Sequence, residues 1–179
     1  MRAALDLAPM LLRPGELRFA EWPEIDLDAA MWTVPAMRMK RELREKLHGA
    51  PHLVPLPKQS IAVFRDLHIL TGHAKMVFRG ERHHDRAMSE NTINAALRAI
   101  GFSADKVTGI AFRATARTML HERLGFDRNV IEAQLAHSLS DSLGRAYNRI
   151  MVALRIRLWL PLSRLLSKGL FRGSTHSPP

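Results

Sequence analysis

Apolar residues recur along the chain at two different spacings, which predict helices over most of its length and a few short strands. Helical spacing or composition marks residues 3–12, 16–22, 60–70, 89–100, 112–124 and 130–136, and a last short helix is expected around Tyr147. Pro14 fits a first-turn helical position, because the N–H that it lacks has no partner there. Ser89 and Asp127 are candidate N-caps, and Gly101 and Gly125 are candidate terminators.

Three short apolar segments predict strands instead. They are Met31–Val34, Leu53–Leu56 and Met76–Phe78, and the first alternates as a half-buried strand does. A charged, basic connector at residues 37–49 joins the first two, and residues 24–28 look like a turn. The prolines of the second segment favour a sheet edge, where a missing N–H costs little. We expect a mainly helical α+β domain with a small antiparallel sheet on one side.

Length and charge narrow the class of protein. The 179 residues suit one domain, and 27 Lys and Arg against 17 Asp and Glu give a net charge of +10. Such a balance favours a polyanionic partner, nucleic acid before membrane. The absence of cysteine excludes disulfides and thiolate sites. We identify no signal peptide and no apolar stretch long enough to span a membrane, so a cytoplasmic location is expected.

The composition changes near residue 150. No acidic residue occurs from Ser142 to Pro179, while seven Arg and Lys do. The run Met151–Leu162 is apolar but is interrupted by arginines and by Pro161. We expect a folded domain over residues 1–150 and a divergent basic tail, partly disordered, over 151–179. A tail that packs on a partner is an alternative, and a membrane-surface helix is disfavoured by Pro161.

Five side chains carry the chemistry of metal-free phosphodiester cleavage. Such cleavage needs a nucleophile, cations that hold the non-bridging oxygens, and a proton donor for the leaving oxygen. Arginine suits the cation role because its planar fork binds phosphate bidentately, and tyrosine can form a covalent phosphotyrosyl intermediate. The chain supplies these types in the order Arg13, Lys40, Arg113, His137 and Tyr147, and Tyr147 is its only tyrosine. No cofactor and no metal is expected.

The motifs around these residues resemble the tyrosine recombinase, or phage integrase, family, and within it the integrases of satellite phages and genomic islands. The resembling segments are RPGEL at 13–17, MRMK at 37–40, MSENT at 88–92, TGIAFR at 108–113, QLAH at 134–137 and RAYNR at 145–149. The resemblance implies the catalytic domain of that family, a helical bundle with a three-stranded antiparallel sheet. It also implies site-specific DNA recombination, or integration, through a 3′-phosphotyrosyl intermediate.

The resemblance assigns a role to each residue. Arg13 and Arg113 would clamp the scissile phosphate, and Lys40 would protonate the leaving 5′-oxygen, with Lys46 as the alternative because the register of the basic connector is open. His137 would hydrogen-bond a phosphate oxygen, and Tyr147 would attack the phosphorus. The implied partner is double-stranded DNA bound by a homo-tetramer, with no small-molecule substrate and no membrane.

Three departures from the family pattern support an alternative function. Ile110 stands where the family has a histidine, three positions before Arg113. Only 12 residues precede Arg13, where the family has further DNA-binding modules, and the tail beyond Arg149 does not resemble the family's usual helix. The alternative is a truncated, catalytically impaired integrase remnant that only binds DNA. A third hypothesis, a basic interaction protein without a DNA role, predicts weak DNA binding even at low salt.

Overall fold

The computed structural model describes residues 2–7, 12–40, 43–81, 83, 85–103, 105, 108–128, 131, 132 and 135. The described helices are α1 (Arg2–Leu7), α2 (Pro14–Arg18), α3 (Leu43–His48), α4 (Lys58–Thr71), α5 (Thr92–Ala99) and α6 (Ala111–Thr118). The strands are β1 (Ile25–Asp26), β2 (Met31–Val34) and β3 (His52–Pro55). The basic tail from residue 151 and the helix expected around Tyr147 lie outside the described residues.

The three strands form one antiparallel sheet in the order β1-β2-β3. Trp32 of β2 lies opposite Ile25 on one side and Val54 on the other. Trp32 and Val34 are buried while their neighbours in β2 are partly exposed, so the alternation seen in the sequence does mark a half-buried strand. The α+β fold with a three-stranded antiparallel sheet is confirmed, and β3 lies at an edge as its prolines indicated.

One predicted strand was wrong. The third strand is not Met76–Phe78 but β1, in the segment that was expected to be a turn. Met76 makes only an isolated bridge to Glu21, and the Val77 N–H donates to the Ala20 carbonyl at 2.9 Å. The apolar run at 76–78 therefore packs along the loop before β1. A two-residue strand such as β1 is too short to show an alternating pattern.

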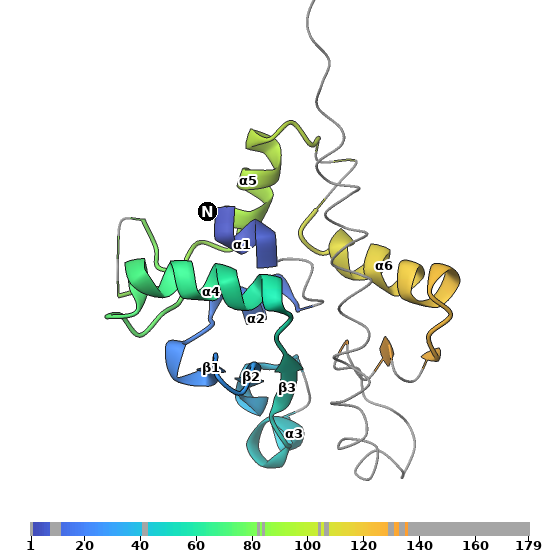
Figure 1. Ribbon diagram of the computed structural model, residues 1–179, viewed down its shortest axis with the longest axis horizontal. Coiled ribbons are helices and arrows are strands. Elements are labelled where there is room, and N and C mark those ends of the chain that lie inside the picture. The colour runs from blue at the N-terminus through green and yellow to red at the C-terminus, as the bar shows by residue number, and fades with distance from the viewer. Residues whose placement is uncertain are drawn as a thin grey trace, which may run out of the picture.

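Helix α4 covers the sheet through aromatic contacts. The Phe64 ring meets the Trp32 ring edge-on, with centroids 6.1 Å apart, and the Trp22 ring at 6.3 Å. The Trp22 indole N–H donates to the Thr71 carbonyl at 2.9 Å, which fixes the end of α4. Helix α1 packs against α4 and α5, so α4 lies between the sheet and these two helices (Figure 1). This layering forms the core.

Several helix boundaries differ from those expected. Helix α2 begins at Pro14 but ends at Arg18, and a separate 3-10 turn, Trp22–Glu24, follows it. Helix α5 begins at Thr92, and Ser89 is not its N-cap, because the Ser89 hydroxyl accepts the N–H of Asn91 instead. The helix that follows the 108–110 turn is α-helical only to Thr118 and continues as a π-helical turn, Met119–Arg123.

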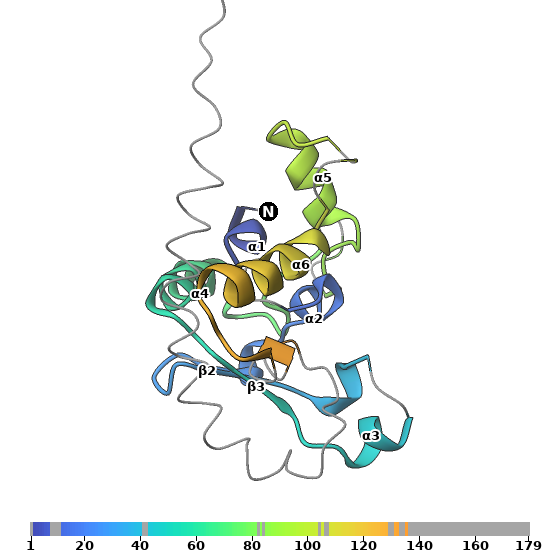
Figure 2. The same cartoon turned by 90° about the vertical axis from the view of Figure 1, so that its right-hand side faces the viewer.

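Other expectations hold. Helix α4 contains the predicted helix 60–70, and Gly101 and Gly125 adopt φ angles of 92° and 65°, which side chains with a Cβ rarely tolerate. The basic connector contains α3, which the sequence pattern did not indicate. In both views α6 lies at about the same height as α1 and α4, and the sheet and α3 lie below these helices (Figure 2). Over the described residues, no helix has the length and apolar character that crossing a membrane requires.

Phe64 allows a test of this packing. Phe64→Ala removes the ring between both tryptophans and should lower the free energy of unfolding by about 3–5 kcal/mol, measured by urea denaturation. Ile69→Ala is the matched control on the same helix, because Ile69 is 81% exposed, and its effect should stay within about 0.5 kcal/mol. Equal effects of the two substitutions would contradict the described core.

Candidate functional site

Arg13 is fixed by the start of its own helix. It occupies the N-cap position of α2, and Glu16 is the third residue of that helix. The Glu16 carboxylate accepts the Arg13 backbone N–H at 2.9 Å and forms an ion pair with the Arg13 guanidinium at 3.1 Å. Glu16 is only 3% exposed, so its charge is buried against the guanidinium that it orients. The position of Glu16, three residues after the N-cap, is the signal that could have identified it.

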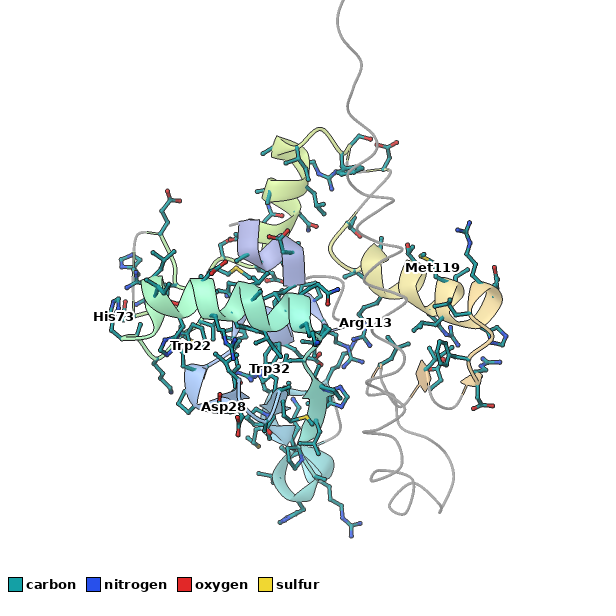
Figure 3. The ribbon with its side chains drawn as sticks, in the orientation of Figure 1. Trp22, Asp28, Trp32, His73, Arg113 and Met119 are labelled. Atoms are coloured by element: carbon teal, nitrogen blue, oxygen red, sulfur yellow. The ribbon has the colours of Figure 1, made fainter. Side chains whose placement is uncertain are left out.

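Arg113 lies on the side of α6 that faces the rest of the described molecule (Figure 3). Its guanidinium donates to the Leu135 carbonyl at 2.6 Å. Burial lowers the pKa of Arg113, and the positive charge of Arg13 lowers it further, while Glu16 and Glu132 act in the opposite direction. An arginine remains protonated under all ordinary conditions, so both groups stay cationic. The structure thus brings together two guanidiniums that lie 100 positions apart in the sequence.

Gly109 explains how the segment before α6 approaches α2. Its N–H donates to the Asn94 side-chain oxygen at 2.9 Å. A Cβ at this position would lie 3.2 Å from the Ile93 Cγ2 atom and 3.4 Å from the Pro14 Cγ atom. Only glycine permits this contact without displacing a neighbour, so α5 and the first turn of α2 locate the segment that leads to Arg113. Asn94 was not identified from the sequence, because its partner lies 15 residues away.

Of the remaining candidate residues, the structure describes the two lysines but not the histidine or the tyrosine. Lys40 is exposed on the bend after the 3-10 turn Ala36–Arg38, and Lys46 is partly buried in α3. Neither lysine forms a hydrogen bond or an ion pair with another described residue, so the choice between them stays open. His137 and Tyr147 lie outside the described residues.

Ile110 lies in the turn just before α6 and is 69% exposed. Its carbonyl accepts the Arg113 N–H at 3.1 Å, so its backbone belongs to the structure that presents Arg113. His121 is 11 positions further along, and a helical rise of about 1.5 Å per residue places it roughly 15 Å away. His121 therefore does not replace the missing imidazole.

Among the described residues, the site consists of two arginines that stay protonated, Arg13 and Arg113, and of two carboxylates that offset their charge, Glu16 and Glu132. Two guanidiniums held in this way can bind a tetrahedral oxyanion through several charge-assisted hydrogen bonds. Among the described residues, no group of three or more acidic or histidine side chains is arranged to hold a metal ion.

Comparison with known families assigns the chain. The model of the phage integrase family matches residues 2–153. The chain belongs to the phage integrase family. The predicted resemblance to tyrosine recombinases is therefore confirmed, and the matched region contains all five candidate residues.

Individual relatives agree with this membership. The chain resembles the integrase of Enterobacteria phage P4, with 37% identity over 142 residues that cover 76% of this chain and 32% of the relative. It is 35% identical to the putative protein IntB of Escherichia coli K12 over 153 residues, 82% of this chain and 39% of the relative. The chain thus spans roughly a third of the length of these curated relatives.

A solved structure supports the fold independently. The crystal structure of XerA recombinase resembles this chain with a TM-score of 0.59, at 18% sequence identity, over 97% of this chain and 58% of the other. At so low an identity the likeness concerns the fold alone. It shows that the mainly helical domain with its small sheet is a tyrosine recombinase catalytic fold.

The arginine pair predicts an anion site that can be tested without DNA. Sulfate at about ten times its dissociation constant should stabilise the chain by about 1.4 kcal/mol relative to chloride of equal ionic strength. That corresponds to a rise in Tm of about 3–6 °C. Arg113→Met should abolish this difference, and Arg65→Met, which removes an exposed arginine of α4, should preserve it. An equal sulfate effect in both variants would show that the pair binds no anion.

Proposed function

We propose that this chain is the catalytic part of a site-specific tyrosine recombinase that cleaves and rejoins double-stranded DNA. The observation that carries the proposal is the juxtaposition of Arg13 and Arg113 within a domain of the phage integrase family. The net charge of +10 supports a nucleic-acid partner. Since the alignment covers only 32% of the phage P4 integrase, the activity of the whole protein is part of the proposal.

The proposed reaction uses the arginines to hold the scissile phosphate. Both guanidiniums bind non-bridging oxygens and stabilise the charge of the pentacoordinate transition state. The Tyr147 oxygen attacks the phosphorus in line, gives its proton to water and forms a 3′-phosphotyrosyl bond as the bond between the phosphorus and the 5′-oxygen breaks. The 5′-oxygen leaves and takes a proton from Lys40, or from Lys46, while His137 donates a hydrogen bond to the phosphate. Attack by a 5′-hydroxyl of the exchanged strand then reverses these steps and releases Tyr147.

The proposal includes an assembly of four protomers on two duplexes, because strand exchange needs four phosphodiester bonds to be cut and rejoined.

A specific observation favours the alternative of a chain that binds DNA without turnover. Ile110 can neither donate a hydrogen bond nor carry a proton, yet it occupies the exposed turn beside Arg113. The guanidinium pair does not depend on this position, so DNA binding can persist without cleavage.

Covalent trapping separates the two functions. The chain is incubated with labelled duplexes of randomised sequence, each nicked so that cleavage releases a short fragment that cannot be rejoined. A protein–DNA adduct should survive denaturing electrophoresis with the natural chain and disappear with Tyr147→Phe, which differs by one oxygen atom. An adduct that persists in Tyr147→Phe would refute this nucleophile. No adduct, together with DNA affinity that falls steeply with salt, would establish the binding-only alternative.

Ile110→His tests whether the substitution limits catalysis. An imidazole in the exposed turn restores a donor beside Arg113 and should accelerate adduct formation on the trapped substrate about tenfold or more. Ile110→Leu is the control, because it keeps an apolar side chain of similar volume, and it should leave the rate unchanged. If the histidine and leucine variants react at the same rate, Ile110 is not the limiting position.

A further inference from the structure

A second arginine of α6 forms an ion pair with the segment that precedes His137. The Arg117 guanidinium lies 2.6 Å from a carboxylate oxygen of Glu132. Arg117 follows Arg113 by four positions, so both side chains lie on the same face of α6. Glu132 precedes His137 by five positions. The ion pair therefore connects the helix that carries one candidate phosphate ligand to the segment that leads to another.

A separate contact joins the same two segments. The Arg113 guanidinium donates to the Leu135 carbonyl at 2.6 Å, three residues beyond Glu132. Leu120, Ile131 and Leu135 are all buried members of one apolar core. Thus Ile131 and Leu135 share the core with Leu120 of the π-helical turn after α6, and two polar contacts link their segment to α6 itself. Apolar contacts alone have little directional preference.

Glu132 also acts on Arg113 electrostatically. Its carboxylate is one of two that raise the pKa of Arg113, against the effects of burial and of Arg13. The Glu132 side chain is 16% exposed and that of Arg117 is 44% exposed. Because almost half of the Arg117 side chain is exposed to water, which screens the pair, the pairing adds only modestly to the overall stability of the fold. The ion pair is therefore better explained by alignment than by stabilisation.

We infer that Glu132 is a positioning residue, which through its ion pair with Arg117 aligns Arg113 of α6 with the segment leading to His137. The inference rests on the proposed function, since it treats Arg113 and His137 as ligands of the scissile phosphate. Glu132 does not touch the reacting atoms. It sets the geometry of groups that do, and a misplacement of about 1 Å can lower a rate roughly a hundredfold.

The test compares cleavage with binding in the full chain. Glu132→Gln and Arg117→Met should each slow adduct formation on the trapped duplexes about 10-fold to 100-fold, with DNA affinity changed less than about twofold. The double variant should lose no more than Glu132→Gln alone, because the two side chains act as one unit. Arg117→Lys keeps the charge and should retain most of the rate. Glu122→Gln, at an exposed glutamate of the neighbouring π-helical turn, is the control and should have no effect.

A spectroscopic measurement tests the inference without cleavage. The side-chain Nε–H resonance of Arg113 in ¹⁵N NMR spectra should shift in Glu132→Gln and Arg117→Met and stay constant in Arg117→Lys and Glu122→Gln. If the natural chain forms no adduct, the proposed function fails, and the Arg113 resonance still decides the alignment. If the adduct forms but Glu132→Gln matches Glu122→Gln in rate and resonance, the inference is overturned and the proposed function stands.

Discussion

Two like charges held near each other are the constraint on which the site depends. Burial of Arg113 disfavours its charged form, and repulsion by Arg13 adds to this cost, as the lowered pKa of Arg113 reflects. Glu16 and Glu132 offset this cost, one from the helix of Arg13 and the other from the segment packed on α6. The Arg13 guanidinium is paired within the start of α2, whereas the Arg113 guanidinium donates to the Leu135 carbonyl and is acted on by the charges of Arg13 and Glu16. The start of α2, the segment before α6 and the segment before His137 must therefore fold together for the pair to form.

This constraint explains why the polar contacts of the site join elements that are distant in sequence. Asn94 holds Gly109, which lies near Pro14, and a Cβ at Gly109 would approach the Ile93 side chain to 3.2 Å and require it to shift. The repulsion between the guanidiniums is therefore balanced when the chain folds rather than when a ligand arrives. Under the proposed function, an incoming phosphate would meet cations that are already oriented, which is the condition under which electrostatic stabilisation of a transition state is strongest.

Much of the fold could be predicted from the sequence because its signals are local. The helical face of α4 and the alternation around Trp32 are properties of a few consecutive residues. Strand β1 and helix α3 were missed because their segments are short and polar. Strand β1 forms by pairing with β2, and α3 packs on the 3-10 turn Ala36–Arg38 that precedes it. Arg13 and Arg113 were found through motif order. Glu132 was not identified from the sequence, because its proposed role depends on Arg117, which lies in a different element, α6.

The family pattern combines two tasks, holding the phosphate and moving protons, and Ile110 bears only on the second. The guanidinium pair owes its geometry to Glu16, Gly109 and Glu132, and the side chain of Ile110 takes no part in holding it. Exposed isoleucine at that turn removes a donor and a proton carrier but adds no charge and closes no contact. Under both proposed functions, the recombinase and the chain that only binds DNA, the same guanidinium pair would bind the phosphate. They differ only in whether the remaining groups move protons fast enough to complete the reaction.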